Sequence, residues 1–485
     1  MEMFGQSNSI ILADNLNYLS GCKQVGKNNF IDLIYIDPPF NSNRTYNIPF
    51  KNDSQTSEEA FNDIWSVYAY YDELEYLKNE NFNLYSFLYS LEKSNILKSY
   101  ICYLTMMSIR CSLMRETLKD SGTFFYHCDP TMSHYIKIIL DYIFGSNNFR
   151  NEIIWSYKTG GIGNRAFASK HDVILFYSKT NRYTYNPQRE RKETNSINQA
   201  IYKGNEIFED DKGKYTYHFR PGTNPKYPDG TKEYLDYANM RDVWTDIPTI
   251  NAMASERLYP TQKPRKLLER IILTGSNTGD LIADFFMGGG TTIIESVKSS
   301  RKFIGTDLNT RALQITIERL LQEKKVLKKD FYVYGIPKSS KELRDLVEKN
   351  LIGKSVSTFE LEEITIRYYL NGVTGNDKKV HDGSIDGRFT FKFNNEYKKG
   401  IVQVTKGSNL NHFKAFCSEV GNGKNDIGVY ITFANQVTKD MNMIAYGPNG
   451  YGKIGDVYKI QILTFEDLID NQKQYEVPSN IKLFV

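Results

Sequence analysis

Short apolar runs with strand character alternate with amphipathic helical segments over much of the chain, and this alternation constrains the fold more than any other feature. The apolar runs lie at 32–36, 123–127, 280–286 and 302–307, and a helical pattern covers 133–145. A helix between two strands brings the chain back to the same edge, so that neighbouring strands run parallel. The sequence therefore predicts an α/β fold with a doubly wound, mostly parallel sheet and a smaller C-terminal α/β domain.

The length of 485 residues exceeds what one hydrophobic core usually serves, so we expect several domains. Residues 181–242 are rich in Tyr, Asn, Lys and Gly and show no sustained period, whereas regular patterns lie on both sides of them. The predicted division is 1–180 for the first part of the sheet domain, 181–242 for an insertion, 243–335 for its second part and 338–485 for the C-terminal domain. Residues 54–94 have a helical pattern.

Composition excludes several classes of protein. Hydrophobic residues make up 40% and charged residues 24%, as in ordinary globular proteins. No apolar run approaches the roughly 20 residues that span a bilayer, and the first residues lack a secretion signal, so we expect a cytoplasmic protein without a membrane partner. The five cysteines are too scattered for a disulfide framework or a zinc site. A net charge of +4 permits nucleic-acid binding without requiring it.

A glycine cluster, Gly288-Gly289-Gly290, follows an apolar strand that ends at Asp284, and it opens a helix. Glycines there let a ligand approach the backbone, and the free N–H groups of the helix start face it. The next strand ends in Asp307, whose carboxylate is placed to accept hydrogen bonds from ribose hydroxyls. The pattern is neither GxGxxG nor a P-loop, so it favours a nucleoside cofactor over a dinucleotide or a triphosphate. By itself, the cluster is equally compatible with a tight turn.

A second motif, Asp37-Pro38-Pro39-Phe40, directly follows a short apolar strand. Two successive prolines end the strand and make a rigid loop at its carboxyl end. The Asp37 carboxylate and the Pro38 carbonyl could accept the two hydrogens of a planar amine, and Phe40 could stack on a base flipped out of a duplex. Alone, the tetrapeptide would more often be an ordinary proline turn.

The two motifs together resemble the S-adenosylmethionine-dependent amino-methyltransferases of DNA. Further segments fit the same family, and their order is similar to that of its β class, in which the target-recognition region lies between the two halves, here at 181–242. These segments are Ile36–Asn47, Phe124–Asp129, Phe149–Trp155, Val243–Pro248 and Arg257–Pro264. Phe285 and Met287 depart from the residues common in the family, but neither replaces a polar ligand.

The resemblance implies roles for particular residues and identifies partners. The residues that would bind and activate the target amine are Asp37, Pro38, Pro39 and Phe40. The residues that would hold S-adenosylmethionine are Asp284, Phe286, Gly288, Gly290 and Thr291, with Asp307 on its ribose and Thr261, Gln262 and Lys263 at its far end. Double-stranded DNA is the implied substrate, and the resemblance is compatible with a homodimer and with a separate restriction subunit. We interpret Cys128 as a small buried residue and His127 as structural, since nothing pairs with it in the sequence.

Asp at the head of the tetrapeptide resembles the adenine-N6 members, because cytosine enzymes more often carry Ser there. The expected function is therefore site-specific methylation of adenine N6. The alternatives are an N4-cytosine methyltransferase and, from a different class, a DNA-binding module that has lost catalysis.

Residues 382–407 resemble the core of the PD-(D/E)xK restriction endonucleases, which continues toward the C-terminus. Asp386 and Gln403 fit the two positions that would hold Mg²⁺, if the domain is an active nuclease. The lysine that should come two residues after Gln403 is displaced by one, to Lys406. Because strand side chains alternate between faces, this shift turns the lysine away from the metal unless a bulge restores it. The alternation favours a domain that does not cleave, and an active one would make the chain a bifunctional restriction–modification enzyme.

Overall fold

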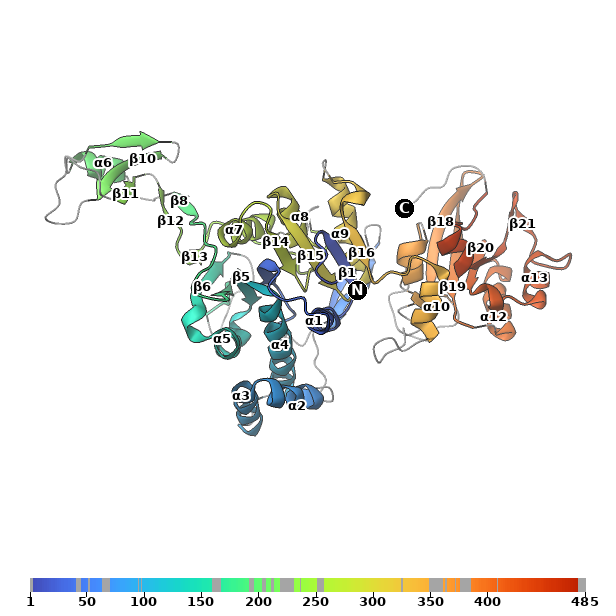
Figure 1. Cartoon of the computed structure of the whole chain (residues 1–485). Coiled ribbons are helices and arrows are strands. Elements are labelled where there is room, and N and C mark those ends of the chain that lie inside the picture. The colour runs from blue at the N-terminus through green and yellow to red at the C-terminus, as the bar shows by residue number, and fades with distance from the viewer. Residues whose placement is uncertain are drawn as a thin grey trace.

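The structure is a computed structural model of the whole chain (Figure 1). It describes residues 3–40, 45–50, 53–62, 70–94, 96, 98–158, 167–191, 196–202, 206–210, 213–218, 231–235, 237–250, 257–323, 326–348, 361–362, 364–370, 372–375, 385–407 and 409–478. Within these ranges, no helix combines the length and the hydropathy that crossing a bilayer requires.

A nine-stranded sheet with the order β13-β6-β7-β5-β2-β14-β15-β1-β16 forms the centre of the fold. The other eight strands all run in one direction, and β7 alone runs antiparallel to both of its neighbours, β5 and β6. This confirms the predicted mostly parallel α/β sheet. The strands are β1 (Ser9–Leu12), β2 (Ile31–Ile36), β5 (Leu118–Cys128), β6 (Phe149–Ser156), β7 (His171–Ser178), β13 (Val243–Trp244), β14 (Leu281–Asp284), β15 (Lys302–Asp307) and β16 (Tyr332–Tyr334).

Helices cover both faces of this sheet. Alternate strand residues divide between the faces: Ile34 packs in the core beneath one set of helices, and Leu33 packs in the core beneath the other. The first set is α1 (Asn15–Gln24), α4 (Lys98–Thr117) and α5 (Pro130–Phe144), and the second is α7 (Arg265–Gly275), α8 (Thr291–Lys298) and α9 (Thr310–Gln322). The result is a three-layer α/β/α domain.

Local sequence signals set where these helices begin. Asp14 caps α1 by accepting the N–H of Leu16, and Asp129 caps α5 by accepting those of Thr131 and Met132. Pro130 stands at the first position of α5, where its missing N–H costs nothing. Both caps follow strands that run in the same direction, so they lie at the same edge of the sheet.

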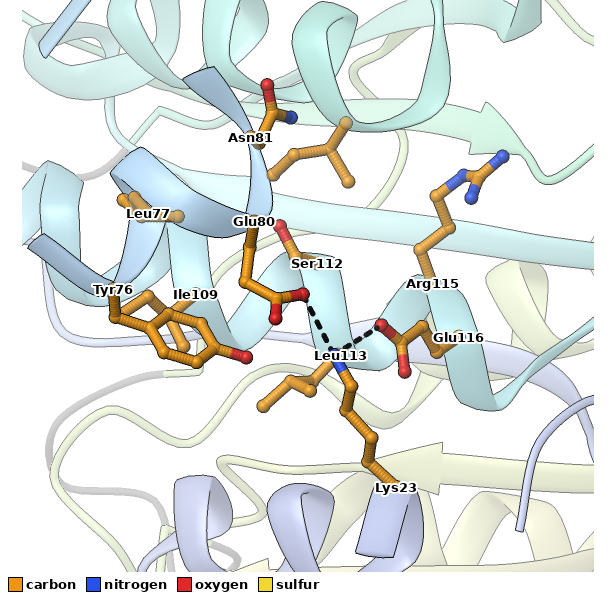
Figure 2. A pocket seen from close by; sticks show the side chains of 11 residues that line it. Lys23, Tyr76, Leu77, Glu80, Asn81, Ile109, Ser112, Leu113, Arg115 and Glu116 are labelled. Carbon is orange, nitrogen blue, oxygen red and sulfur yellow. Dashed lines mark hydrogen bonds and ion pairs between the residues drawn. The ribbon is translucent and has the colours of Figure 1, made fainter. Parts of the chain in front are cut away.

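The segment between β2 and α4 differs in part from the prediction. Two antiparallel strands, β3 (Thr45–Phe50) and β4 (Asp53–Asn62), occupy its first part, so the helical prediction for 54–94 is wrong there. It is right from residue 70 on, where α2 (Tyr70–Glu80) and α3 (Phe82–Lys93) form a hairpin beside α4 (Figure 1), while 63–69 lie outside the described residues. A small polar pocket lies between α1, α2 and α4, and there Lys23 pairs with Glu80 at 3.0 Å and with Glu116 at 3.3 Å (Figure 2).

Regular elements occur within 181–242, although the sequence shows no period there. They form a three-stranded antiparallel sheet, a two-stranded antiparallel pair and a short helix, which extend away from the central sheet on the side opposite the C-terminal domain (Figure 1). The elements are β8 (Arg189–Arg191), α6 (Ser196–Tyr202), β9 (Phe208–Asp210), β10 (Gly213–His218), β11 (Thr231–Tyr234) and β12 (Tyr237–Asn239). Strands this short carry too few residues for a two-residue alternation to stand out.

The C-terminal part contains a five-stranded mixed sheet of order β17-β18-β19-β20-β23, with a core separate from those of the central sheet. The hairpin β18–β19 is antiparallel, and β19, β20 and β23 run parallel. The elements are α10 (Ser340–Glu348), β17 (Thr374–Gly375), β18 (Gly387–Phe393), β19 (Glu396–Val404), α12 (Leu410–Gly421), β20 (Ile427–Thr432), α13 (Lys439–Tyr446), β21 (Lys453–Ile454), β22 (Val457–Tyr458) and β23 (Ile460–Thr464). The predicted smaller α/β domain is confirmed.

Candidate active site

Three acidic residues follow or end neighbouring parallel strands at one edge of the sheet. Asp37 follows β2, Asp284 ends β14 and Asp307 ends β15, and these strands pair side by side. Parallel neighbours end at the same edge, so the proline motif and the glycine turn meet there although most of the chain separates them in sequence. The charge of Asp37 contributes to the raised pKa of Asp284, in agreement with this closeness.

The glycine turn is held by backbone hydrogen bonds at the ends of β14 and β15. The Gly288 N–H donates to Asp307 Oδ2 at 2.8 Å, and the Met287 N–H donates to the Thr306 carbonyl at 3.1 Å. Gly290 caps α8 in the left-handed region, with φ +73°, and a Cβ there would lie 2.4 Å from the Thr316 hydroxyl. Gly290 is therefore required both by its backbone conformation and by the close approach of α9.

Two carboxyls organise this turn: that of Asp284 is buried, and that of Asp307 is partly buried. Asp284 accepts the N–H of Phe286 at 3.0 Å and the hydroxyl of Thr292 at 2.5 Å. Asp307 accepts the N–H groups of Gly288 and Asn309, each at 2.8 Å and each on a different oxygen. The Leu308 N–H also donates to this carboxylate, so of its about four lone-pair positions one remains for a hydroxyl of a ligand.

Burial raises the pKa of both carboxyls in spite of these hydrogen bonds, to about 7 for Asp284 and to about 6 for Asp307. Asp284 therefore binds its proton more tightly in the folded chain than in the unfolded one, where the pKa is about 4. The stabilisation that this gives is complete below pH 4 and is lost as the pH rises through 7.

We expect the thermal midpoint of the protein without cofactor to fall, relative to that of Asp284→Asn, as the pH rises from 4 to 8. The variant removes the titrating group but keeps its shape and one acceptor oxygen. The measurement is differential scanning calorimetry of both proteins across this range. A difference between the two midpoints that does not change with pH would contradict the raised pKa.

The end of β1 contributes residues that the sequence analysis did not select. The Asn15 side chain donates to the Phe285 carbonyl at 2.7 Å, and its own oxygen accepts from Arg110 Nε at 2.7 Å. Arg110 also pairs with Asp14 at 3.0 Å. Through these contacts, Asp14, Asn15 and Arg110 hold the backbone at Phe285, directly before the glycine turn. The sequence signal was the cap at Asp14-Asn15, which directly follows an apolar strand, as Asp37 does.

Lys263 lies against the proline motif. Its ammonium forms an ion pair of 2.6 Å with Asp37 Oδ2, and the side chains of Lys263 and Asp37 are 12% and 14% exposed. The same ammonium lies 5.2 Å from the centre of the Phe40 ring. The resemblance had assigned Lys263 to the far end of the cofactor, whereas the structure brings it to the residues expected to bind the target amine.

The remaining predicted residues lie around this edge. Gln262 turns back to accept the Leu258 N–H at 3.0 Å, and the Thr291 hydroxyl is buried 3.3 Å from Arg319. Pro38 is buried, and the partly buried residues are Pro39, Phe40, Thr261, Phe286 and Gly288.

His127 is the centre of a buried hydrogen-bonded group behind Phe40. Its Nδ1 lies 2.8 Å from the Tyr35 hydroxyl, its Nε2 lies 3.0 Å from Asp172 Oδ2, and its ring stacks on Phe40 with centres 6.0 Å apart. Asp172 also accepts the Tyr157 hydroxyl at 3.0 Å. The sequence offered no partner for His127, but the structure supplies one in Asp172. Its partner comes from the start of β7, which runs antiparallel to β5, and no local pattern announces this. Cys128 is fully buried, as expected.

In the C-terminal domain, Asp386 comes directly before β18, whose residue Gly387 pairs with Val402. The next step of that register places Asp386 opposite Gln403. The Asp386 carboxylate accepts the Val404 N–H at 2.7 Å, and burial raises its pKa to about 6. The Gln403 side-chain oxygen is buried and, among the described atoms, has no hydrogen-bond partner. The pairing of β19 with β20 has no register shift, and β19 ends at Val404, before Lys406. The bulge that would have restored the lysine therefore does not occur in this pairing.

The parts of the chain that the structure covers contain no cluster of three or more His, Cys, Asp or Glu side chains able to hold a metal ion.

The family model described as DNA methylase matches residues 31–318, which is more than half of the chain. The chain belongs to this family. The match contains both the proline motif and the glycine turn, together with the segment 181–242 between them.

Characterised relatives agree with this family. The Type II methyltransferase M1.MboII of Moraxella bovis is 34% identical over 165 residues, which are 33% of this chain and 58% of the relative. The Type II methyltransferase M.HpaI of Haemophilus parainfluenzae is 28% identical over 309 residues, 63% of this chain and 73% of the relative. The DNA adenine methyltransferase YhdJ of Escherichia coli (strain K12) is 30% identical over 177 residues, 35% of this chain and 52% of the relative. The chain thus spans little more than half the length of the first and the third.

Proposed function

We propose that the chain transfers a methyl group from S-adenosylmethionine to adenine N6 at a specific sequence in double-stranded DNA. The observation that carries this proposal is the meeting of Asp37-Pro38-Pro39-Phe40 with the glycine turn at the ends of β2 and β14. One edge of the sheet thereby holds the groups for a planar amine and the groups for a nucleoside cofactor.

The residues of the proline motif would prepare the amine. The lone pair of an exocyclic amine is delocalised into the base, so the amine is a poor nucleophile. Acceptance of its two hydrogens by the Asp37 carboxylate and the Pro38 carbonyl favours the pyramidal form, whose lone pair is available. Phe40 would stack on the flipped base, and the fixed positions of these groups would orient it for in-line attack.

The residues at the glycine turn fit the proposed cofactor. The Gly288 N–H holds the Asp307 carboxylate at 2.8 Å, and that carboxylate keeps an acceptor position for a ribose hydroxyl. S-adenosylmethionine supplies the methyl group from a sulfonium, which is a good leaving group. Thr261 and Phe286, both partly buried at this edge, would contribute to the walls.

Adenine is favoured over cytosine by Asp37 at the head of the tetrapeptide, and the relative YhdJ is named a DNA adenine methyltransferase. Labelled cofactor and mixed-sequence duplex DNA test the activity, and hydrolysis of the product separates N6-methyladenine from N4-methylcytosine. We expect label only in N6-methyladenine. Label in N4-methylcytosine would contradict the base assignment, and the absence of label from DNA would contradict the activity.

The segment 181–242 would read the DNA sequence, because it lies between the two halves of the sheet domain in the sequence and its elements extend away from the central sheet beyond β13 and β6 (Figure 1). Relatives named Type II methyltransferases support a place in a restriction–modification system, with either a homodimer or a separate restriction subunit as partner. Sequencing DNA from cells that express the protein would identify both the methylated base and its flanking sequence.

We propose further that the C-terminal domain has a nuclease-like fold but does not cleave DNA. Asp386 opposite Gln403 is the arrangement that a Mg²⁺ site needs, but Lys406 lies beyond the end of β19, and Thr405 occupies the position two residues after Gln403. We expect no Mg²⁺-dependent nicking of supercoiled plasmid by the full chain. Nicking that Asp386→Ala removes would contradict this and would make the protein a bifunctional enzyme.

A further inference from the structure

Lys263 contacts the two groups that a flipped base would use. Its ammonium pairs with Asp37 Oδ2 at 2.6 Å and lies 5.2 Å from the centre of the Phe40 ring, where it makes a cation–π contact. A target adenine would donate its amine to the same carboxylate and stack on the same ring. The ammonium and the base therefore compete for the same partners.

We infer that Lys263 is a stand-in for the target base, occupying Asp37 and Phe40 when no base is flipped and leaving them when adenine enters. This inference rests on the proposed function. It gives Lys263 a role distinct from cofactor binding. The ion pair protects a nearly buried carboxylate from remaining unpaired, which would cost free energy in a protein without DNA.

A second acceptor for the displaced ammonium lies within the same group of side chains. Burial by itself would raise the pKa of Asp172, but the hydrogen bond and charge of His127, the charge of Lys263 and the Tyr157 hydroxyl together lower it. The Asp172 carboxylate is thus already within electrostatic reach of Lys263. His127 and Tyr157 hold Asp172 in place from two sides, at 3.0 Å each, so its position does not depend on Lys263.

This competition also bears on which base can enter. An adenine replaces the lost ammonium by donating its own N–H to Asp37, so the carboxylate stays paired. A thymine has no exocyclic amine and would leave the carboxylate without that donor, which is costly in a nearly buried site. Exchange of one donor for another thus favours bases that carry an amine.

Permanganate oxidation of the thymine opposite the target adenine tests the inference, because that thymine becomes reactive when its partner leaves the stack. The duplex carries the recognition site found by sequencing, and S-adenosylhomocysteine replaces the methyl donor. Removal of the competing cation in Lys263→Met should raise the ratio of flipped to stacked adenine about tenfold, the effect expected of a partly desolvated cation–π contact. Lys263→Arg keeps the cation and should behave like the wild type.

Two further measurements separate the alternatives. Lys266→Met removes an exposed charge three residues away and should not raise the reactivity. The affinity of Lys263→Met for S-adenosylmethionine, measured by calorimetry, should stay within about twofold of that of the wild type. The reason is that a Lys263 side chain that competes with the flipped base does not bind the cofactor. Lys263→Gln provides a second uncharged variant if the thermal midpoint of Lys263→Met shows that it is not folded.

The inference is overturned if a folded uncharged variant shows thymine reactivity equal to or lower than that of the wild type, or if it loses much of its cofactor affinity. In either case, methylation by the wild-type protein would leave the proposed function intact. A wild-type protein that methylates no DNA would instead overturn the proposed function, and the inference with it.

Discussion

Asp37→Ala is expected to lower the incorporation of methyl groups into DNA by at least about a hundredfold, which is the usual effect of removing one preorganised hydrogen-bonding group from a reacting atom. Asp37 lies at the carboxyl end of β2, beside the strand that leads into the glycine turn, and its side chain is 14% exposed. The measurement is single-turnover transfer from labelled S-adenosylmethionine with saturating protein.

The matched control for this variant is Asp32→Ala, which removes a carboxylate from the same strand but at its far end. Asp32 pairs with Lys119 at 2.8 Å and accepts the Leu281 N–H at 2.9 Å, so its loss affects stability and not the pocket. At a temperature where both variants are folded, only Asp37→Ala should lose transfer. Activity of Asp37→Ala within tenfold of the control would show that this carboxylate does not activate the amine.

Gly290→Ala is expected to abolish measurable binding of S-adenosylmethionine at concentrations that saturate the wild type. A side chain at φ +73° costs about 1–2 kcal/mol. The new Cβ would also lie 2.4 Å from the Thr316 hydroxyl and 2.8 Å from its Cβ, an overlap that costs about 1–3 kcal/mol further and can be relieved only by moving the turn. Isothermal titration of the cofactor measures the loss.

Gly279→Ala is the control for the free-energy cost of placing a side chain at positive φ. Gly279 has φ +87° and lies just before β14, but a Cβ there would meet no atom within 4 Å. Both variants should lower the thermal midpoint through backbone strain, whereas only Gly290→Ala should lose the cofactor. Equal cofactor affinities in the two variants would contradict the assignment of 288–290 as part of the binding site.

Several features of the site follow from local sequence alone. The apolar runs that become β2, β14 and β15, and the acids at or after their ends, are readable because each element is specified by its own side chains. The glycine cluster is readable because only glycine adopts positive φ without strain, and both Gly288 and Gly290 do so. The short strands within 181–242 were missed, since a few residues are too few to reveal a period. The ten residues of β4 were missed because they are mostly polar and show no apolar alternation.

Local sequence was enough to predict the kinds of element, the residues at the strand ends and, through the resemblance, the family. Three features emerge only from the folded chain: β2 lies beside β14, Lys263 pairs with Asp37 across 226 positions, and Asp172 reaches His127 from an antiparallel strand. The physical reason is that strand order and long-range ion pairs depend on how separate hydrophobic faces pack together. No single segment carries that information, because each face could be buried equally well against several others.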